Sequence, residues 1–323
     1  MGDLLTFVIV NYDTAALLEE CLGSIRQYNT FPAKVVVVDN ASTDGSVEMV
    51  RQQFSEVHLI VNSANEGYPK AVNRGLMATD TPFSFILNSD VRLTENTLPL
   101  LIDHIQTHPR VGIAAPAQRT PDGKALLTVH RDPTLWREIL RNLFFTDFWR
   151  YRVRGADLAR EMREPKVVDW VMGAALFVRQ EMVDQVGAMD ETVFMYGEEF
   201  DWAYRARKAG WEVSLVPASV VIHHKGATAD RVLQARRYSL VTKSNYYFFA
   251  KHFGLAYLPF LVLAHVVGSA LRVLLVSPLC LAGFQEARFQ WWEHLYTVCV
   301  SLDPRVYRWI RRALAEVSHR EER

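Results

Sequence analysis

Four short apolar runs before residue 90, each closed by a polar tip, constrain the fold of this chain most strongly. The runs cover residues 5–10, 34–38, 57–61 and 83–87, and each is rich in strand-forming residues. The segments between them carry apolar residues at a spacing of three to four, as amphipathic helices do. Strands that alternate with helices in this way predict a parallel, doubly wound α/β sheet.

The polar tips after these four runs are expected to lie together, because parallel strands end at the same edge of a sheet. They contain Asn11, Asp39, the segment 65–67 and the sequence Asn88-Ser89-Asp90. The Asp90 carboxylate is a hard oxygen ligand suited to Mg²⁺ or Mn²⁺, which takes substrate phosphates and waters as its other ligands. A plain strand-to-turn exit is the simpler interpretation of each tip alone, since Asn, Ser and Asp are common in turns.

Several other classes of function are disfavoured by the sequence. It has no glycine-rich dinucleotide fingerprint after the first run and no phosphate-binding loop of NTPases. The 36 Lys and Arg residues balance 36 Asp and Glu residues, so nothing suggests bulk nucleic-acid binding. Three widely spaced cysteines form neither a disulfide framework nor a zinc pattern, which favours a reducing compartment. The first residues lack the basic region of a signal peptide.

Two later segments carry side chains suited to chemistry. Glu198, Glu199 and Asp201 precede a helix expected over residues 203–209, where they could cap the helix through its dipole or supply a general base. His223 follows a strand expected over residues 212–216, and a histidine at a strand exit is available to bind a metal. Gly173 lies within a strand expected over residues 167–177, where a small residue suits close approach of a ligand.

The remaining elements before residue 236 are predicted in less detail. Ser46 or Asp44 is expected to cap a helix over residues 47–54, and a helix over 94–106 and a strand over 111–115 follow the fourth run. Residues 116–166 are less regular. Their aromatic and basic segment, residues 136–154, is interpreted either as a loop with a covering helix or as a lid or acceptor-binding segment.

The character of the chain changes after residue 235, which predicts two domains, 1–235 and 236–323. The second contains an apolar stretch, 254–284, close to the length of a membrane span but interrupted by Pro259, His265, Arg272 and Pro278. Three hypotheses stay open: helices that lie in the membrane interface with Trp291, Trp292 and flanking Arg as anchors, a helical subdomain buried in a homodimer, and a true or re-entrant span. Residues 305–323 are predicted to form a charged amphipathic helix.

Taken together these pieces resemble the glycosyltransferases of sequence family two, which have the GT-A fold, over roughly residues 4–255. The resemblance rests on five segments in the family's order: VDNASTDGS (38–46), NEGY with NRG (65–68 and 73–75), LNSD (87–90), EEFD (198–201) and the stretch from Pro217 to His223. It implies a GT-A doubly wound, mostly parallel sheet with a C-terminal helical appendage.

The resemblance also implies roles for the residues in the donor site. Asp39 looks like the carboxylate that hydrogen-bonds a pyrimidine base beside Asn11, and the further donor-site residues would be Asn65, Gly67, Asn73, Asn88 and Gly173. Asp90 looks like the metal ligand of the D-x-D motif, whose first Asp is replaced by Asn88. The second protein ligand to Mg²⁺ or Mn²⁺ would be His223, with His224 as the alternative.

The catalytic base of the family is usually the Asp of a Glu-Asp pair, and this chain has Glu198-Glu199 in its place. The resemblance therefore points to Glu199, although Glu is one methylene longer and a small misplacement can matter for rate. Asp201 is the alternative base. The expected chemistry is a single displacement in which an acceptor hydroxyl attacks the anomeric carbon and inverts its configuration.

The function implied is an inverting, metal-dependent glycosyltransferase that is cytoplasmic and peripheral to the inner face of the cell membrane. The donor would be dTDP-L-rhamnose, because the Asn-x-Asp variant and the C-terminal helices resemble the rhamnosyltransferase-like branch, with UDP-sugars left open. The acceptor would be a cell-surface polysaccharide or its lipid-linked precursor. One alternative is a nucleotidyltransferase, but such an enzyme needs a Gly-, Arg- or Lys-rich loop after the first strand, and this chain has none there. The other is a non-catalytic membrane-associated protein that binds sugar nucleotides.

Overall fold

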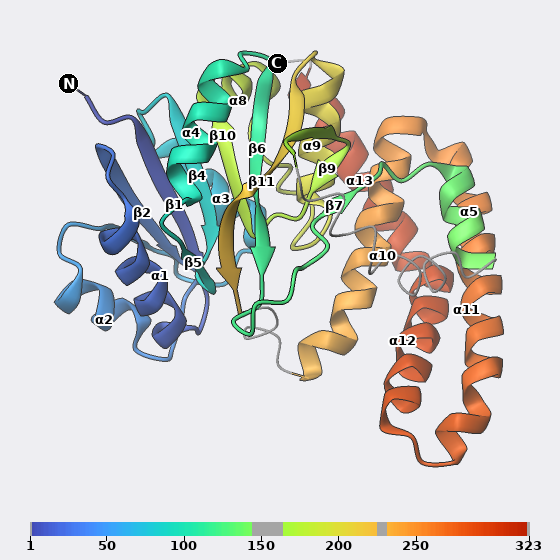
Figure 1. The fold of residues 1–323 in the computed structure, drawn as a ribbon. Helices are drawn as coiled ribbons and strands as arrows, with labels where there is room; N and C mark the ends of the chain where they lie inside the picture. The colour runs from blue at the N-terminus through green and yellow to red at the C-terminus, as the bar shows by residue number, and fades with distance from the viewer. Residues whose placement is uncertain (1, 144–163, 225–230, 322–323) are drawn as a thin grey trace. The chain divides into compact units, whose positions relative to one another are not determined.

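The computed structural model describes residues 2–143, 164–224 and 231–321, and their contacts form two compact units (Figure 1). The first unit comprises the described parts of Met1–Asp132, Ala156–Phe194 and Glu198–Thr228. The second comprises those of Pro133–Gly155, Met195–Gly197 and Ala229–Arg323. The segment 133–143 thus belongs to the second unit, although the sequence alone places it in the domain 1–235.

The first unit is built on one mixed sheet in the order β3-β2-β1-β4-β10-β6-β11-β5, with β8 beside β11. The first four strands pair in parallel, whereas β10 runs antiparallel to β4 and β6. The strands are β1 (Leu5–Asn11), β2 (Ala33–Asp39), β3 (His58–Val61), β4 (Phe83–Asn88), β5 (Val91–Leu93), β6 (Val111–Arg119), β8 (Lys166–Val168), β10 (Ala175–Arg179) and β11 (Glu212–His223). The predicted fold class is confirmed.

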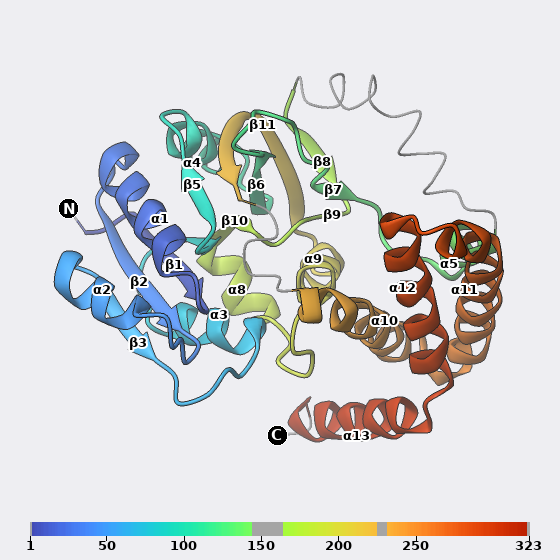
Figure 2. The same ribbon diagram turned by 90° about the horizontal axis from the view of Figure 1, so that it is seen from below.

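Helices cover both faces of this sheet, as Figure 2 shows. Leu5, Phe7 and Ile9 of β1 point to the face covered by α1 (Ala15–Tyr28) and α4 (Thr97–Thr107), where the main apolar core lies. The opposite face carries α3 (Tyr68–Met77), α8 (Gln180–Val186) and α9 (Glu198–Lys208). Alternation along the strand explains the division, since successive side chains of a strand point to opposite faces. A short α2 (Ser46–Gln53) packs beside α1 and β3.

The helix α3 sits so close to the sheet that Gly75 has no room for a side chain. A Cβ at this position would overlap the Val8 side chain of β1 and lie 3.4 Å from Val38 of β2. This close packing holds the loop before α3 against the strand ends, where the polar tips gather.

Three predictions about single elements are wrong. The strand expected over residues 167–177 consists of β8, the short β9 (Trp170–Val171), which pairs with β7 (Val129–His130), and β10, because a turn at residues 173–174 interrupts it. The helix α9 begins at Glu198 instead of residue 203, so its carboxylates lie in the first turn. Gly45, with φ of 88°, occupies the N-cap position of α2 instead of Ser46 or Asp44, and Asp44 accepts a hydrogen bond from the Ala15 backbone at the start of α1.

The second unit is helical. It contains α5 (Leu135–Leu143), α10 (Arg231–Phe253), the short 3₁₀ turn η1 (Leu255–Tyr257), α11 (Leu258–Leu281), α12 (Gln285–Leu302) and α13 (Pro304–Glu321). Of the aromatic and basic segment 136–154, residues 136–143 form most of α5, and the rest lies outside the described residues. The stretch Leu255–Leu281 is long and apolar enough to cross a membrane, judged by length and composition alone.

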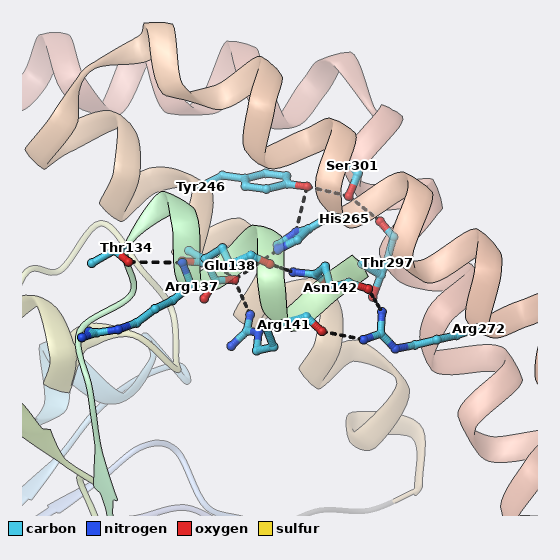
Figure 3. Close-up of polar contacts among 11 residues, drawn as sticks. Thr134, Arg137, Glu138, Arg141, Asn142, Tyr246, His265, Arg272, Thr297 and Ser301 are labelled. Carbon is cyan, nitrogen blue, oxygen red and sulfur yellow. Dashed lines mark hydrogen bonds and ion pairs between the residues drawn. The ribbon is translucent and has the colours of Figure 1, made fainter. Parts of the chain in front are cut away.

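His265 and Arg272, which interrupt this apolar stretch, face α5 or α10 (Figure 3). His265 lies 3.4 Å from the buried Glu138 carboxylate and 3.1 Å from the Tyr246 hydroxyl. Arg272 donates to the backbone carbonyls of Arg141 and Asn142 at 2.8 and 2.7 Å. The helix continues through Pro278 into its last turn. The two polar interruptions, His265 and Arg272, therefore attach α11 to its neighbours.

Glu138 is the centre of this network. Burial alone would raise the pKa of its carboxyl, but the Arg141 guanidinium and the hydrogen bonds from His265 and Asn245 outweigh burial and hold the pKa below its usual value. A carboxyl whose pKa is lower in the folded than in the unfolded chain stabilises the fold above its ordinary pKa. That stability is lost as the pH falls through the folded-state pKa, so the second unit should weaken below about pH 4.3.

We expect Glu138→Gln to lower the free energy of unfolding at pH 7 by about 2–3 kcal/mol, the cost of losing buried hydrogen bonds to a charged group. The measurement is urea denaturation followed by circular dichroism between pH 3.5 and 7. The difference between variant and wild type should shrink toward acid pH, where the wild-type carboxyl is itself protonated. Glu316→Gln, an exposed carboxyl of α13, is the matched control and should stay within about 0.5 kcal/mol of wild type. A pH-independent difference would contradict the assignment.

Candidate active site

The loops after β1 and β2 are joined by a buried pair of side chains. Asn11, the last residue of β1, donates from Nδ2 to Asp39 Oδ2 at 2.8 Å and to Ser42 Oγ at 3.1 Å. The other carboxylate oxygen of Asp39 accepts from the Ser42 backbone at 2.8 Å. The parallel register that pairs Asn11 with Asp39 produces this contact. Each oxygen keeps a lone pair, so Asp39 could accept further hydrogen bonds from a ligand.

A second group of amides joins the loops after β2 and β3. Asn40 donates to Asn65 Oδ1 and to the Gly67 carbonyl, both at 3.2 Å, and accepts from Asn62 at 2.8 Å. Gly67 has φ of 93°, and a Cβ there would overlap the Phe194 carbonyl, so the position requires glycine. The predicted donor-site residues Asn65 and Gly67 therefore shape the loop that leads into α3.

Asp90 and His223 lie next to each other although they are far apart in the sequence. The antiparallel pairing of β11 with β5 places His223 opposite Val91, and the His224 backbone donates to the Asp90 carbonyl at 3.0 Å. His223 Nε2 is then 3.3 Å from Asp90 Oδ1, and both side chains are buried. The alternative, His224, turns away and lies 3.5 Å from Glu20 Oε2.

Gln118 fixes the orientation of the His223 ring. This fully buried side chain of β6 accepts a hydrogen bond from His223 Nδ1 at 2.9 Å. In a neutral ring with its proton on Nδ1, the Nε2 lone pair would point toward the Asp90 carboxylate, and two acceptors would face each other. A cation between them resolves this repulsion, and a metal-binding histidine ordinarily donates its other ring N–H in this manner. Sequence reasoning missed Gln118 because a lone Gln inside an apolar strand carries no motif.

The pair fits two ligands of one divalent cation. Metal–ligand distances of about 2.1 Å place neighbouring ligands of an octahedral ion about 3 Å apart, close to the observed separation of 3.3 Å. Among the described residues no group of three or more His, Cys, Asp or Glu side chains could hold a metal ion. A cation here would thus take its other ligands from phosphates and water, as Mg²⁺ commonly does.

We expect Gln118→Leu to weaken Mn²⁺ binding by about 10–100-fold, because the His223 ring loses the partner that sets its tautomer. Mn²⁺ titration followed by electron paramagnetic resonance measures the affinity. Nitrogen NMR of the imidazole should show a loss of the Nδ1–H tautomer in the variant. Gln52→Leu, an exposed position of α2, is the control. Unchanged Mn²⁺ affinity in Gln118→Leu would rule out this positioning role.

The charges of three carboxylates act on the buried phenol of Tyr68, at the start of α3. The Tyr68 hydroxyl donates to the Gly173 carbonyl at 3.1 Å. Burial raises the pKa of this phenol well above its usual value, and the charges of Glu198, Glu199 and Asp90 raise it further. A Cβ on Gly173 would lie 3.5 Å from the Glu199 Cβ. The predicted metal ligand, the Glu-Glu pair and Gly173 are therefore neighbours. Tyr68 belongs to the NEGY motif, but the motif alone does not assign a role to its side chain.

The two glutamates of the pair differ in environment. Glu198 is buried, and its Oε2 has no hydrogen-bond partner among the described residues. Burial and the charge of Glu199 raise the pKa of the Glu198 carboxyl well above its usual range. Glu199 is only half-buried. Its position beside Gly173 and its access to solvent make it the better placed of the two to accept a proton.

Asp201, the alternative base, is committed to another contact. Its buried carboxylate forms an ion pair with Arg205 at 2.9 Å, one turn further along α9. Arg205 in turn donates to the carbonyls of Val186 and Ala188, at 2.7 and 2.8 Å. Asp201 thus joins α9 to the end of α8.

Two other predicted donor-site residues, Asn73 and Asn88, differ in whether their amide oxygen already has a hydrogen-bond partner. The Asn73 amide donates to the Met189 carbonyl and to Glu191, at 2.8 and 2.9 Å, and accepts from the Met189 backbone at 3.0 Å. These contacts tie α3 to the segment before α9. Asn88, beside Asp90, has a buried Oδ1 that lacks a partner in the described part of the chain, which leaves an acceptor for a ligand.

Comparison with protein families gives a match to the family described as glycosyl transferase family 2, over residues 6–167. An N-acetylglucosaminyl-diphospho-decaprenol L-rhamnosyltransferase of Mycobacterium tuberculosis is 34% identical over 268 residues, which is 79% of this chain and 87% of that protein. A low-salt glycan biosynthesis hexosyltransferase of Haloferax volcanii, Agl10, is 25% identical over 72% of this chain and 70% of its own length.

Two solved structures share the fold. The mannosyltransferase PcManGT of Pyrobaculum calidifontis, in complex with GDP-Man and Mn²⁺, aligns with a TM-score of 0.56 and 17% identity over 94% of this chain and 87% of its own. GalNAc-T7 with UDP, GalNAc and Mn²⁺ aligns with a TM-score of 0.54 and 16% identity over 79% and 51% of the two chains. Both were solved with Mn²⁺ and a nucleotide or nucleotide-sugar. At this level of identity the likeness establishes only the fold of this chain.

Proposed function

Because this chain belongs to glycosyltransferase family 2, we propose that it transfers L-rhamnose from dTDP-L-rhamnose to a lipid-linked glycan, with inversion at the anomeric carbon. The observation that carries the proposal is the arrangement of Asp90, His223 and Glu199 around one edge of the sheet. The choice of sugar rests on the rhamnosyltransferase at 34% identity and on the Asn88-Ser89-Asp90 motif. UDP-sugars are the alternative donors, since nothing in the donor loops distinguishes the two pyrimidines.

Each part of the site has a proposed task in this reaction. Asp39 and Asn11 hold the pyrimidine base, and Asn88 offers its free carbonyl oxygen to the donor. Asp90 and His223 would hold Mg²⁺ or Mn²⁺, which offsets the charge of the diphosphate leaving group when bound. Glu199 accepts the proton of the acceptor hydroxyl as that oxygen attacks the anomeric carbon. The raised pKa of the neighbouring Glu198 carboxyl favours Glu199 as the member of the pair that carries the negative charge.

The acceptor and the location are proposed from the second unit. One side of α11 is exposed and apolar along its length, with Phe260, Leu263, Val267, Leu271 and Leu274 at spacings of three and four. Trp292 and Tyr296 of α12 are also exposed, whereas Trp291 donates to Ser277 at 3.0 Å. Aromatic residues beside an apolar helical face are typical of helices that lie in a membrane interface. We therefore place the protein at the cytoplasmic membrane surface, where a lipid-linked acceptor is found. A buried homodimer interface is the competing explanation of this face.

A thermal-shift panel with dTDP, UDP, GDP and CDP, each with and without Mn²⁺, tests the donor. A ligand that binds only the folded chain raises its melting temperature by mass action. We expect the largest metal-dependent shift with dTDP. A larger shift with UDP would support a glycosyltransferase that uses a UDP-sugar as its donor. The absence of a shift with any nucleotide would favour a non-catalytic protein. Transfer of rhamnose to a lipid-linked acceptor, with the anomeric configuration read by NMR, tests the rest.

A further inference from the structure

A pocket of about 340 Å³ that is open to solvent, here called the cavity, lies in the second unit, where the start of α11 meets α13. Its wall is formed by Leu255, Leu258, Pro259, Val262, Tyr307 and Arg311. This volume is within the range of small-molecule sites in proteins. None of the proposed steps of glycosyl transfer uses these residues.

The two sides of the cavity differ in chemistry. The residues from η1 and α11 are apolar, and the Tyr307 hydroxyl on the other side is already bonded to the Ser301 carbonyl. Arg311 is exposed and has neither an ion pair nor a hydrogen-bond partner among the described residues. A guanidinium group is well suited to phosphate, which it binds with two parallel hydrogen bonds. The cavity therefore matches an amphiphile whose hydrocarbon chain begins at a phosphate.

The apolar side of the cavity is continuous with the exposed face of α11. Phe260 and Leu263, the first exposed residues of that face, belong to the same turns as the wall residues Pro259 and Val262. A hydrocarbon chain too long for the cavity would thus leave it along apolar surface instead of entering water. Burial of such a chain is favourable in proportion to the apolar area removed from water.

We infer that this cavity binds the phosphate end of a polyisoprenyl diphosphate, the lipid part of the acceptor. This inference rests on the proposed function, which supplies a lipid-linked acceptor. Arg311 holds the phosphate, and the first isoprene units pack against Leu258, Pro259 and Val262. A single branched chain suits a cavity of this size better than the paired acyl chains of a glycerophospholipid.

The test measures binding to the full chain by equilibrium dialysis in detergent, with saturating dTDP and Mn²⁺ to occupy the donor site. The probes are farnesyl diphosphate, farnesol and inorganic diphosphate. Farnesyl diphosphate should bind at least tenfold more tightly than either part alone. Arg311→Gln should weaken it about tenfold, and Val262→Asp, which places a charge in the apolar wall against the isoprene chain, should weaken it further. Arg308→Gln, another exposed arginine of α13, should change the Kd less than twofold.

Three results would overturn the inference. Equal binding of inorganic diphosphate would show a general anion site, and equal competition by phosphatidylglycerol vesicles would show a phospholipid site. Equal effects of Arg311→Gln and Arg308→Gln would show that the cavity is not used. The proposed function fails separately, if wild type shows no melting shift with any nucleotide while Arg311-dependent binding of farnesyl diphosphate persists. Phe260→Ser should weaken binding to vesicles without changing the Kd for farnesyl diphosphate, which separates membrane docking from the cavity.

Discussion

Glu199→Gln should lower kcat by about 10²–10⁴-fold and leave donor binding unchanged, because the amide cannot accept the proton of the acceptor hydroxyl. The side chain keeps its size beside Gly173, so the melting temperature should stay close to that of wild type. Steady-state transfer assays give kcat, and the thermal shift with dTDP and Mn²⁺ reports on donor binding. Full activity in this variant would exclude Glu199 as the base.

Asp201→Asn is the matched control for this experiment, since both changes convert a carboxylate into an amide within one turn of α9. It breaks the buried ion pair with Arg205, and loss of one partner from such a pair costs about 3 kcal/mol of stability. We therefore expect a lower melting temperature with kcat within a few-fold of wild type. A fall in kcat as large as that of Glu199→Gln, in protein that is still folded, would transfer the role of base to Asp201.

Asp90→Asn should abolish the metal-dependent part of the dTDP thermal shift and lower kcat/KM by about 10³-fold. The amide removes the charged ligand that would bind the cation together with His223. A bound metal stabilises the negative charge that develops on the phosphate by several kcal/mol. Each factor of ten in rate corresponds to about 1.4 kcal/mol of activation free energy, so a loss of this size accounts for the expected fall. Mn²⁺ binding, followed by electron paramagnetic resonance, should weaken in parallel.

Asp80→Asn is the control for Asp90→Asn, because it removes a carboxylate of the same kind from an exposed ion pair with Lys34. Solvent screens such an exposed pair and it lies outside the proposed site, so both Mn²⁺ binding and transfer should be unchanged. If Asp90→Asn retained a wild-type response to Mn²⁺, the pair of Asp90 and His223 would not be the metal site.

The second unit illustrates how far a hydropathy pattern can be interpreted. His265 and Arg272 interrupt the apolar stretch in the sequence and make a simple span doubtful, but the pattern does not say what these residues contact. In the structure they bind Glu138 and the carbonyls at the end of α5, a helix that lies much earlier in the chain. Their partners come from a segment that the sequence assigns to the other domain, and no local signal links the two.

The sequence by itself determined the order of strands and helices up to residue 90 and the polar tips at the strand ends. Apolar periodicity and turn-forming residues are local properties, and the parallel arrangement follows from connections long enough to cross the sheet. Asn11 and Asp39 meet for this reason, since they end adjacent parallel strands. The family motifs added the proposed roles of Asp90 and Glu199, which no local pattern supplies.

Only the tertiary structure decided which distant side chains meet. The short β5, which was not expected, pairs with the end of β11 and so brings His223 rather than His224 to Asp90. Gln118 reaches the His223 ring from a neighbouring strand, and Arg205 takes up Asp201 while Glu199 stays accessible. These contacts depend on strand register and on burial. A shift of one residue in the register would turn each side chain to the opposite face of the sheet. A sequence pattern with a period of two or 3.6 residues does not specify the register.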